Sequence, residues 1–367
     1  MHYVLLDDSI QFDGYTSARR ALGGAERAFA AMAGALVKRG HSVTVFNKIQ
    51  YPTWCEGAKW RPLDDFQTLA DADVLVAFRK PSLLGSVRQV KHRILWWVGP
   101  VDPLNGPGAK DFFDSLEPSI VFSSAAQARA FTGSARTTVI APGVRPPFYE
   151  PEPEVNPYPE VGHDMPMPTR SPDQPPPPHA VITTHPQQGL AWTLDIWKKV
   201  IHPQVPAARL AIYSAVLTKG MKGEAVPPEI APILQLVKDA VGSNVVVMEP
   251  RGDKGMADVY RNSRVHLYPS FSQDLVCWTL RDSQAAGCPA VARMAGGVDE
   301  VVVNGQSGFL TPDAMGFGNC AVQILTDDGV YRNLSSVASS ETRRRTWDAA
   351  SADLDAFVAT LDNKPSA

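Results

Sequence analysis

Short apolar runs alternate with helical segments along the first 148 residues of the chain. The first run, residues 3–6, is followed by a polar stretch, a helical segment from about Gly24 to Arg39, and a second run at residues 42–46. Within the helical segment apolar side chains recur at helical spacing, and Gly40 supplies a C-terminal stop. This is a strand–helix–strand unit. Further apolar runs predict strands at residues 74–78, 94–98, 120–122 and 139–140.

Prolines interrupt this pattern between Arg145 and His179, and the stretch ends in the run Pro175–Pro178. Proline lacks an amide hydrogen and fixes its own backbone angle, so such a stretch cannot form the interior of a helix or a sheet. Proline-rich segments act instead as extended spacers. The sequence therefore predicts a linker over residues 149–178.

The alternation of strands and helices resumes beyond the linker. It predicts strands at residues 180–183, 209–213, 245–248 and 265–268, with helices at 190–201 and 256–262. Short buried strands alternating with helices indicate a mostly parallel sheet covered on both faces. We therefore predict an α/β fold of two doubly wound, Rossmann-like domains, residues 1–148 and 179–335, facing a cleft. Residues 336–367 are predicted as a C-terminal helical segment that packs back on the N-terminal domain.

Composition narrows the class of protein. Of 367 residues, 44% are hydrophobic and 20% are charged, which is typical of a globular protein. The formal net charge of −3 provides no basic field for nucleic acid, which is therefore not expected as a partner. The four cysteines form no CxxC pair and no metal-ligand spacing, so we expect reduced thiols.

No targeting or membrane segment is expected. The apolar run at the N-terminus is stopped by Asp7 and Asp8, so it lacks the length of a signal peptide. No stretch reaches the roughly 20 apolar residues that a membrane-spanning helix needs. We expect a cytoplasmic protein whose membrane contact, where it has any, is peripheral and at the inner face of the membrane.

The most informative stretch, residues 268–291, predicts a strand, a loop, a helix, a Gly-Cys-Pro turn and a second strand. Asp274 falls in the loop, and Asp282 falls about two turns into the helix, so both carboxylates can face one cleft. The backbone amides of Leu275, Val276, Cys277 and Trp278 would form the helix N-terminus. Such a terminus suits an anionic diphosphate, because its amide hydrogens are unpaired and the helix dipole favours negative charge.

This stretch resembles the donor-site signature of the retaining GT4 glycosyltransferases, which have the GT-B fold. The shared features are two acidic residues separated by seven positions, a helix of small residues and a Gly-x-Pro turn. The resemblance continues through residues 296–302 and 304–310. It implies that Asp274 approaches the transferred sugar, that the amides of residues 275–278 hold phosphate and sugar hydroxyls, and that Asp282 binds ribose hydroxyls.

Gly23 and Gly24 open the first long helix and resemble the Gly-Gly loop of the same family. Glycine lets the backbone approach a phosphate or a sugar closely. The alternative interpretation is a simple helix start with a flexible entry. A nicotinamide-binding fingerprint would need G-x-G-x-x-G directly after the first strand, and that motif is absent there.

The chain departs from the family pattern at several positions. The two acidic residues are aspartates where the family usually has glutamates, so geometry or donor choice can differ. The family's Arg and Lys that contact the diphosphate correspond to Thr183 and Gln188. A departing diphosphate needs compensating charge, so we name Arg251, Lys254 and Arg293 as candidate substitutes. Arg251 also falls where relatives have a loop near the nucleobase, although a solvated turn explains it equally well.

The acceptor side departs as well. Relatives often place a histidine after the strand that ends near Trp97, and this chain has none between His92 and His163. Asp102 is the nearest polar candidate for acceptor contact and is included among the catalytic candidates. A structural turn at the neighbouring prolines explains Asp102 equally well.

Together these features predict a hexosyltransferase-like enzyme of polysaccharide biosynthesis type. It would move a sugar from a nucleotide-diphosphate donor to a glycan, lipid-linked or small-molecule acceptor. The resemblance to the family implies retention at the anomeric carbon and no metal or other cofactor. Two alternatives remain open. One is a nucleotide-sugar-binding protein with little or no transferase activity, and the other is a Rossmann-type oxidoreductase or epimerase.

Overall fold

The computed structural model describes residues 1–150 and 174–362. The chain divides into two compact units. Unit 1 comprises Met1–Ser17, Leu22–Arg145 and Arg345–Ala367, and unit 2 comprises Ala18–Ala21 and Pro146–Arg344. Most of the predicted linker, and residues 363–367 of the predicted C-terminal segment, lie outside the described residues.

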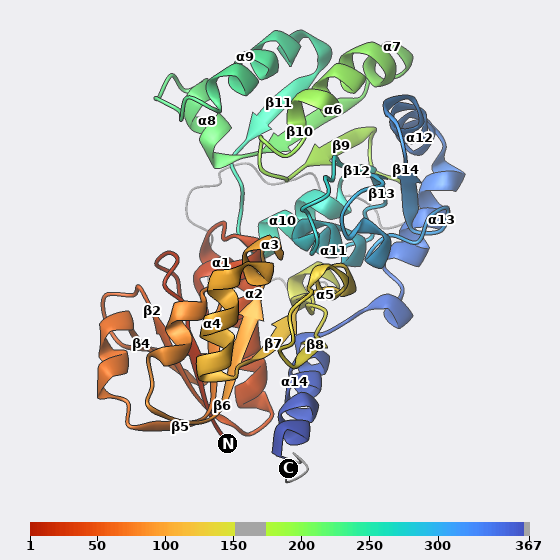
Figure 1. Ribbon diagram of the computed structural model, residues 1–367. Coiled ribbons are helices and arrows are strands. Elements are labelled where there is room, and N and C mark those ends of the chain that lie inside the picture. Colours follow the sequence, from red (N-terminus) through yellow and green to blue (C-terminus); the bar gives the residue numbers. More distant parts are fainter. Residues whose placement is uncertain (151–173, 363–367) are drawn as a thin grey trace. The chain divides into compact units, whose positions relative to one another are not determined.

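Unit 1 is built on an eight-stranded sheet with the order β3-β4-β2-β1-β5-β6-β7-β8 (Figure 1). All of its strand pairs are parallel except β3 with β4. Each strand that the apolar pattern predicted in this half overlaps an observed one. The strands are β1 (His2–Leu6), β2 (Ser42–Asn47), β3 (Thr53–Cys55), β4 (Ala58–Pro62), β5 (Asp71–Phe78), β6 (Gln89–Trp97), β7 (Ser119–Phe122) and β8 (Thr137–Val139).

The hairpin of β3 and β4 was not predicted. Its two-residue turn is formed by Glu56 and Gly57, which both have left-handed backbones with φ angles of 49° and 81°. Turns of this hand match the twist of paired strands. β4 then pairs in parallel with β2 and extends the sheet at one edge. Lys59 and Arg61 interrupt β4, so the hairpin has no continuous apolar run of the kind that predicted the other strands.

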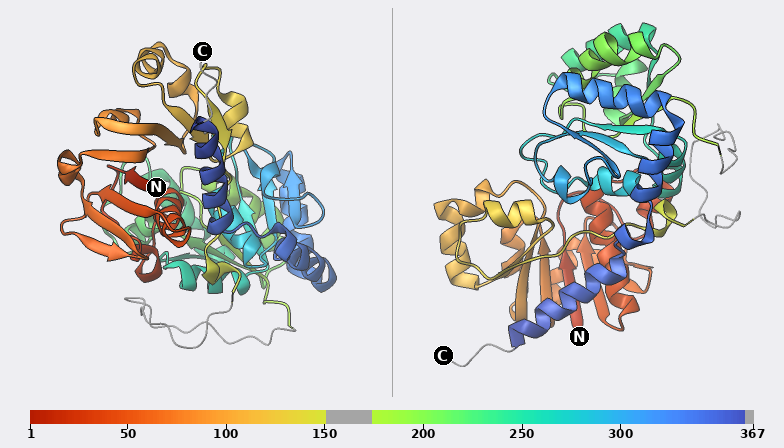
Figure 2. Two further views of the ribbon diagram at one scale, coloured as in Figure 1. Left: turned by 90° about the horizontal axis from the view of Figure 1, so that it is seen from below. Right: turned by 90° about the vertical axis from the view of Figure 1, so that its right-hand side faces the viewer.

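The C-terminal helix belongs to unit 1, where α14 packs against α2 (Figure 2). Asp355 of α14 accepts hydrogen bonds from the Tyr3 hydroxyl at 2.7 Å and from Arg39 Nε at 2.5 Å. His41 Nε2 lies 2.9 Å from the same carboxylate. Although burial opposes it, these hydrogen bonds hold the pKa of Asp355 below its usual value. The helices of this half are α1 (Thr16–Arg19), α2 (Gly24–Lys38), α3 (Asp102–Asn105), α4 (Pro107–Leu116), α5 (Ala125–Ala130) and α14 (Trp347–Asp362).

Unit 2 contains a six-stranded, wholly parallel sheet with the order β11-β10-β9-β12-β13-β14. Its strands are β9 (His179–Ile182), β10 (Arg209–Tyr213), β11 (Val245–Met248), β12 (Val265–Tyr268), β13 (Ala290–Arg293) and β14 (Gly308–Thr311). Its helices are α6 (Leu190–Ile196), α7 (His202–Gln204), α8 (Ala215–Met221), α9 (Ala231–Ala240), α10 (Asp253–Arg261), α11 (Trp278–Ala285), α12 (Ala314–Thr326) and α13 (Asp328–Ala338).

Alternate residues of β13 face opposite sides of this sheet. Val291 packs in the larger core cluster with residues of α6, α9 and α12, whereas Ala290 and Ala292 pack in a second cluster with residues of α11. Successive side chains of a strand point to opposite faces. Both faces are therefore covered, as the continuous apolar runs of a parallel sheet require. The predicted fold class of two Rossmann-like bodies is confirmed.

A buried polar network ties two helices of unit 2 to the ends of two strands. His266 of β12 is fully buried, with Nδ1 2.8 Å from the hydroxyl of Ser283 on α11 and Nε2 3.1 Å from the hydroxyl of Thr183. The hydroxyl of Tyr260 on α10 donates to Thr183 at 3.1 Å. Burial lowers the pKa of His266 to about 3. The imidazole is therefore neutral at ordinary pH and pairs with hydroxyl groups, which suit a neutral ring.

The burial of His266 predicts a pH-dependent stability. Because the pKa of His266 is about 3 in the folded chain and 6.5 as the usual value, protonation favours the unfolded chain. This contribution to the free energy of unfolding should be complete above the usual pKa and fall as the pH drops below it, by up to about 1.4 kcal/mol per pH unit. Thermal unfolding of His266→Gln should lack that part of the pH dependence. His185→Gln, which alters an exposed histidine of the same unit, is the matched control. Parallel pH profiles for His266→Gln and the native chain would contradict the assignment.

Gly143 predicts a second, steric effect on stability. A Cβ atom at this position would lie 2.4 Å from the backbone nitrogen of Trp347, in the segment that leads into α14. Because a backbone atom cannot move aside without displacing the helix, Gly143→Ala should lower the free energy of unfolding by roughly 1–3 kcal/mol. Hydrogen exchange should also speed up in α14. Gly85→Ala is the control, since a Cβ there meets no atom within 4 Å. Equal exchange in α14 for the two variants would rule out the steric explanation.

Candidate functional site

Asp274 lies in the loop after β12, at the carboxyl edge of the unit 2 sheet. Its carboxylate accepts hydrogen bonds from the Tyr268 hydroxyl and from the amide of Cys277. The Cys277 thiol donates to the backbone carbonyl of Asp274 at 3.5 Å. The Ser270 hydroxyl lies 3.4 Å from Asp274 Oδ2. Burial raises the pKa of Asp274, while these hydrogen bonds oppose the rise. The carboxylate is therefore held by donors from its own loop and strand.

Two glycines hold this loop against the turn that follows β13. A Cβ atom on Gly296, whose φ is +67°, would lie 2.2 Å from the carbonyl oxygen of Asp274. A Cβ on Gly297 would lie 2.4 Å from the carbonyl oxygen of Leu275. The amide of Gly297 donates to the Asp274 carbonyl at 2.9 Å. Only glycine permits this approach, because any side chain would collide with backbone atoms.

Helix α11 begins later than the sequence predicted. The four amides of residues 275–278 were expected to form the helix N-terminus, but the helix starts at Trp278, with Cys277 as its N-cap. Cys277 has a left-handed backbone with φ of 56°. A left-handed residue interrupts a right-handed helix, so Leu275 and Val276 lie in the loop before it.

This correction changes which amides can meet a ligand. The amide of Leu275 donates to the carbonyl of Gln273 at 3.1 Å. The amide of Cys277 donates to the carboxylate of Asp274. Two of the four predicted amides are thus engaged within the loop. Those of Val276 and Trp278 remain the stronger candidates for an anion at the start of α11.

Asp282 lies about one turn into α11, not two as predicted, because the helix starts at Trp278. Its side chain is buried, with 7% of its surface exposed, and it has an interaction partner within the chain. A buried carboxylate requires hydrogen bonds to balance the loss of water. Asp274 and Asp282 are thus brought onto one loop and helix, and the ribose-binding role of Asp282 stays a prediction.

The candidate cations of unit 2 lie in different places. Arg251 follows β11, and its Nε atom is buried without a hydrogen-bond partner among the described residues. The Arg251 charge also counteracts the rise in the pKa of Tyr213 that burial causes. Arg293 at the end of β13 lies over the ring of Trp192, 5.5 Å from its centroid. Lys254 lies in the first turn of α10. Buried guanidinium nitrogens usually have hydrogen-bond partners. Of the three candidate cations, Arg251 is therefore favoured as a donor to a ligand.

The two positions that lack the family's cations are polar and uncharged. Thr183 belongs to the network of His266 described above, so its hydroxyl serves the interior of unit 2. The backbone amide of Gln188 donates to the carbonyl of His185 at 2.8 Å, within the loop after β9. Gly189, with φ of +83°, ends this loop and lies against Pro269. The loop after β9 therefore touches the loop that carries Asp274.

In unit 1, Gly23 is the N-cap of α2, and Gly24 is the first residue of the helix. A Cβ atom on Gly23 would lie 2.2 Å from Oε2 of Glu26. Glycine at this position thus leaves room for the Glu26 carboxylate, which folds back over the start of the helix. A carboxylate in the first turn stabilises a helix N-terminus. Any anionic ligand of the Gly-Gly loop would have to approach beside this carboxylate.

Sequence reasoning missed a charged cluster beside Gly23. Arg79, which follows β5, has a left-handed backbone with φ of 53° and donates from Nη2 to Glu26 at 2.8 Å. Its Nε atom lies 3.8 Å from Oδ1 of Asp7, a fully buried carboxylate at the end of β1. Burial raises the pKa of Asp7. Left-handed backbone at a residue other than glycine costs roughly 1–3 kcal/mol and is concentrated at functional sites.

Only one of the two carboxylate oxygens of Asp7 has hydrogen-bond partners among the described residues. Oδ2 of Asp7 accepts from the Ser9 hydroxyl at 2.7 Å and from the Asn47 side-chain amide at 3.0 Å. Oδ1 has no hydrogen-bond partner among the residues that the structure describes. Buried carboxylate oxygens usually have one. The sequence signal for this cluster is an acidic residue, Asp7, directly after the first strand. The apolar pattern alone shows it only as the end of a run.

Asp102 is an exposed residue at the start of the short helix α3, five positions after β6 ends. The neighbouring indole of Trp97 donates from Nε1 to the carbonyl of Pro100 at 2.9 Å. This bond closes the turn between β6 and α3. The predicted acceptor contact of Asp102 stays a prediction, and no described contact joins it to the cluster of Asp7 and Arg79.

The described residues offer neither a cluster suited to a metal ion nor a helix suited to a bilayer. In residues 1–150 and 174–362, no group of three or more His, Cys, Asp or Glu side chains is arranged to hold a metal ion. None of the helices there combines the length and apolar character that crossing a bilayer requires.

The sequence of the second unit matches a known family. Residues 180–327 match the family model described as "Glycosyl transferases group 1". A D-inositol 3-phosphate glycosyltransferase of Xylanimonas cellulosilytica is 31% identical over 129 residues, which cover 34% of this chain and 31% of that protein. An N-acetyl-alpha-D-glucosaminyl L-malate synthase of Bacillus anthracis is 30% identical over 113 residues, or 30% of this chain and 29% of that protein. The chain thus spans about a third of the length of these relatives.

Solved structures match over nearly the whole chain. Sucrose-phosphate synthase from Thermosynechococcus elongatus aligns with a TM-score of 0.70 at 15% identity, covering 98% of this chain and 99% of that one. HepE of Anabaena, in complex with UDP and glucose, aligns with a TM-score of 0.72 at 15% identity, covering 98% and 100%. At this identity the likeness establishes the fold. The chain is therefore a GT-B-fold protein that resembles the group 1 glycosyltransferases, in agreement with the resemblance drawn from its sequence.

Proposed function

We propose that the protein is a glycosyltransferase that moves a sugar from a nucleotide-diphosphate donor to an acceptor. The observation that carries this proposal is the loop of Asp274 and the start of α11, which hold two carboxylates and an open helix N-terminus at the carboxyl edge of a parallel sheet. Ligands of doubly wound sheets bind at that edge. The same residues fall within the segment that matches the group 1 family.

The donor is proposed to lie against unit 2. Its diphosphate would meet the amides at the start of α11, where the helix dipole favours an anion. Arg251 would supply positive charge, since its Nε atom is buried without a partner in the described chain. Asp282 would accept hydrogen bonds from ribose hydroxyls. HepE of Anabaena has been solved with UDP and glucose, which supports a nucleotide-sugar donor as the first class to test.

The acceptor, a glycan, a lipid-linked sugar or a small molecule, is proposed to bind unit 1. Asp102 is the acceptor candidate from the sequence, and Asp7 with Arg79 joins it from the structure, whereas Gly23 and Gly24 are proposed to contact the donor. Oδ1 of Asp7, which has no hydrogen-bond partner among the described residues, can accept a hydrogen bond from an acceptor hydroxyl. The Arg79 guanidinium, whose Nε lies 3.8 Å from that oxygen, balances the charge of the carboxylate. Retention at the anomeric carbon, metal-independent transfer and peripheral contact with a membrane are parts of this proposal. Undiminished transfer in a chelator such as EDTA would support the absence of a metal.

A second candidate function is nucleotide-sugar binding without transfer. It is favoured by Thr183 and Gln188, which are uncharged where the family has Arg and Lys. Only a transferase forms a glycosylated acceptor, whereas a binding protein leaves the acceptor unchanged. A thermal-shift screen across nucleotide sugars identifies the donor, and incubation of that donor with candidate acceptors then separates transfer from binding alone. An oxidoreductase or epimerase would instead respond to a nicotinamide cofactor in the same screen.

We expect Asp282→Ala to weaken donor binding. Loss of charged hydrogen bonds to the ribose would cost roughly 1–3 kcal/mol. Calorimetric titration with the donor found by the screen measures the change. Asp239→Ala, which removes an exposed carboxylate from α9, is the matched control. Because Asp282 is buried, the unfolding temperature of the variant must be measured beside its affinity. A folded Asp282→Ala protein with native affinity would eliminate the ribose role.

Asp274→Asn should slow transfer more than it weakens donor binding. An amide keeps the size of the side chain but loses the charge that would face the developing positive charge on the sugar. Its NH₂ group would also oppose donors that now serve the carboxylate. The measurement is kcat at saturating donor together with the dissociation constant. A loss of affinity with unchanged kcat would show that Asp274 only shapes the binding loop. Asp274→Glu tests whether the longer family residue restores the rate.

A further inference from the structure

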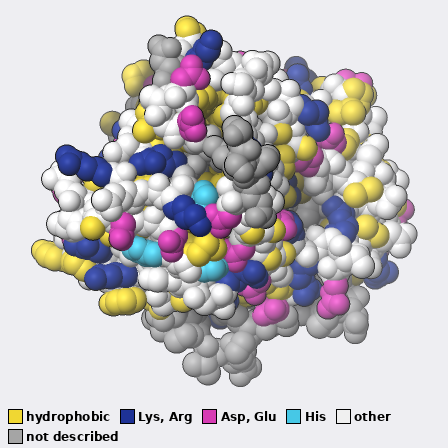
Figure 3. All heavy atoms as spheres, turned by 60° about the horizontal axis from the view of Figure 1, so that its bottom comes forward, with side chains coloured by type: hydrophobic (Ala, Val, Ile, Leu, Met, Phe, Trp, Pro, Cys, Tyr) yellow, Lys and Arg dark blue, Asp and Glu magenta, His cyan; other side chains and the backbone are white. Residues whose placement is uncertain are grey.

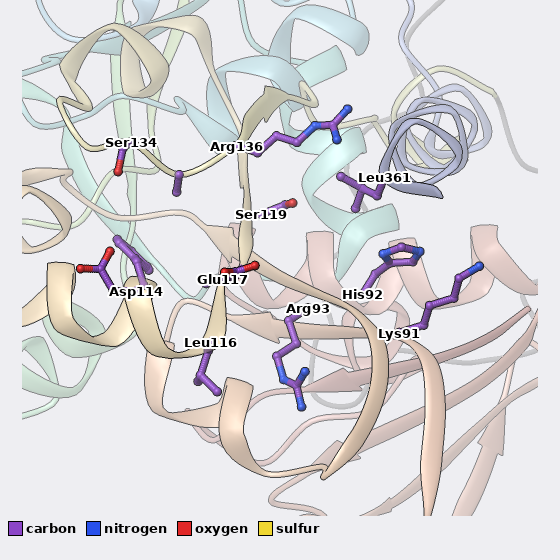
Figure 4. Close-up of a pocket in the computed structure, with 13 residues that line it drawn as sticks. Lys91, His92, Arg93, Asp114, Leu116, Glu117, Ser119, Ser134, Arg136 and Leu361 are labelled. Carbon is purple, nitrogen blue, oxygen red and sulfur yellow. The ribbon is translucent and has the colours of Figure 1, made fainter. Parts of the chain in front are cut away.

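A cavity of about 530 Å³ lies in unit 1 at the amino ends of β6, β7 and β8 (Figure 4). It is bounded by the C-terminal end of α4, by those strand ends and by the last turn of α14. The candidate acceptor residues Asp7 and Asp102 follow the carboxyl ends of β1 and β6. The cavity is thus at the opposite end of the parallel strands and is not part of the site already described.

The side of the cavity next to α14 is basic. Lys91 Nζ and His92 Nε2 lie 2.6 Å and 2.8 Å from the same oxygen of Asp362. Arg136 donates from Nη2 to the carbonyl and the hydroxyl of Thr360, which are both neutral acceptors. Among the described residues, Arg136 has no carboxylate at ion-pair distance. Lys91 and His92 therefore share one carboxylate, while Arg136 bonds to neutral oxygens; Figure 3 shows basic, acidic and His side chains mingled on the face that it draws.

The other side of the cavity carries different chemistry. In Figure 4 Asp114 of α4 and Ser134 lie on the side of the cavity away from Lys91 and His92, and Glu117 lies between the two sides. A carboxylate accepts hydrogen bonds from hydroxyl groups and repels an anion, and a hydroxyl group can donate or accept. Leu361 adds an apolar surface against which a ring can pack. The cavity thus has one end suited to an anion and another suited to hydroxyl groups.

We propose that this cavity is a binding site for a phosphorylated sugar. The phosphate would lie between Lys91, His92 and Arg136, because charge-assisted hydrogen bonds to phosphate are the strongest available to these side chains. The sugar hydroxyls would donate to Asp114 and meet Ser134. The cavity volume lies within the range of about 300–1,000 Å³ found for small-molecule sites.

Asp362 has a defined part in this proposal. Its carboxylate marks the position that an anion prefers between Lys91 and His92, and it competes with the phosphate for both side chains. Asp362 is the last residue of α14, and its side chain is 40% exposed, so its removal disturbs little packing. Asp362→Ala should therefore strengthen binding several-fold, an effect that a merely structural ion pair would not produce.

The test is calorimetric titration of the full chain with glucose 6-phosphate, with inorganic phosphate and glucose as separate probes. Glucose 6-phosphate should bind more tightly than either fragment. The double variant Lys91→Ala/Arg136→Gln should weaken it by at least about tenfold, since it removes two charged donors. Lys59→Ala, which removes an exposed lysine of β4 outside the cavity, is the matched control and should bind as the native chain does.

Two further variants make the result specific. Asp114→Asn should weaken binding of glucose 6-phosphate but leave that of inorganic phosphate unchanged. Asp282→Ala should leave binding of glucose 6-phosphate unchanged, because Asp282 belongs to unit 2. Binding that is lost in Asp282→Ala and retained in the Lys91→Ala/Arg136→Gln variant would move the ligand to the proposed donor site and overturn the proposal. Absence of binding to the native chain, or equal affinity for glucose 6-phosphate and inorganic phosphate, would also overturn it.

Discussion

The close approach of two backbone segments at the carboxyl edge of the unit 2 sheet is the constraint on which the candidate site depends. The turn of Gly296 and Gly297 lies directly against the carbonyl groups of Asp274 and Leu275, with no room for a side chain between them. This contact is available because β12 and β13 are parallel neighbours, so the loops that follow them leave the sheet at the same edge. The position of the Asp274 loop is therefore a consequence of strand pairing.

Within that loop, several hydrogen-bond donors contact one carboxylate, that of Asp274. The hydroxyl of Tyr268 and the amide of Cys277 both donate to the carboxylate of Asp274. A buried carboxylate with fewer partners would be far less stable as an anion. An aspartate is short enough to receive these bonds from its own strand and helix. The acid is thus tied into its own loop.

Unit 1 places different chemistry at the two ends of its parallel strands. At the carboxyl end, Arg79 is shared between Glu26 and the buried Asp7. At the amino end, Lys91 and His92 converge on Asp362 of α14. The same helix is held midway by Asp355, which accepts hydrogen bonds from Tyr3 and Arg39. The C-terminal helix therefore closes the core of unit 1 and also forms one wall of the cavity at its amino end.

The sequence by itself determined the fold class and the location of the acidic pair, because strand runs, helical periodicity and the spacing of Asp274 and Asp282 are local properties of the chain. It did not reveal the hairpin of β3 and β4, because charged residues interrupt β4 and leave no continuous apolar run. It also misplaced the start of α11, since the left-handed backbone of Cys277, which precedes the helix, leaves no sign in the periodic pattern of apolar residues.

The tertiary structure alone decided which distant groups meet. The cluster of Asp7, Glu26 and Arg79 joins three separate segments, and Asp355 reaches residues more than 300 positions away. Side-chain pairs of this kind leave no trace in periodicity, since each partner is an ordinary polar residue within its own segment. Only the pairing of parallel strands and the packing of α14 bring such groups together, and that is the physical reason why the sequence predicted the elements but not these contacts.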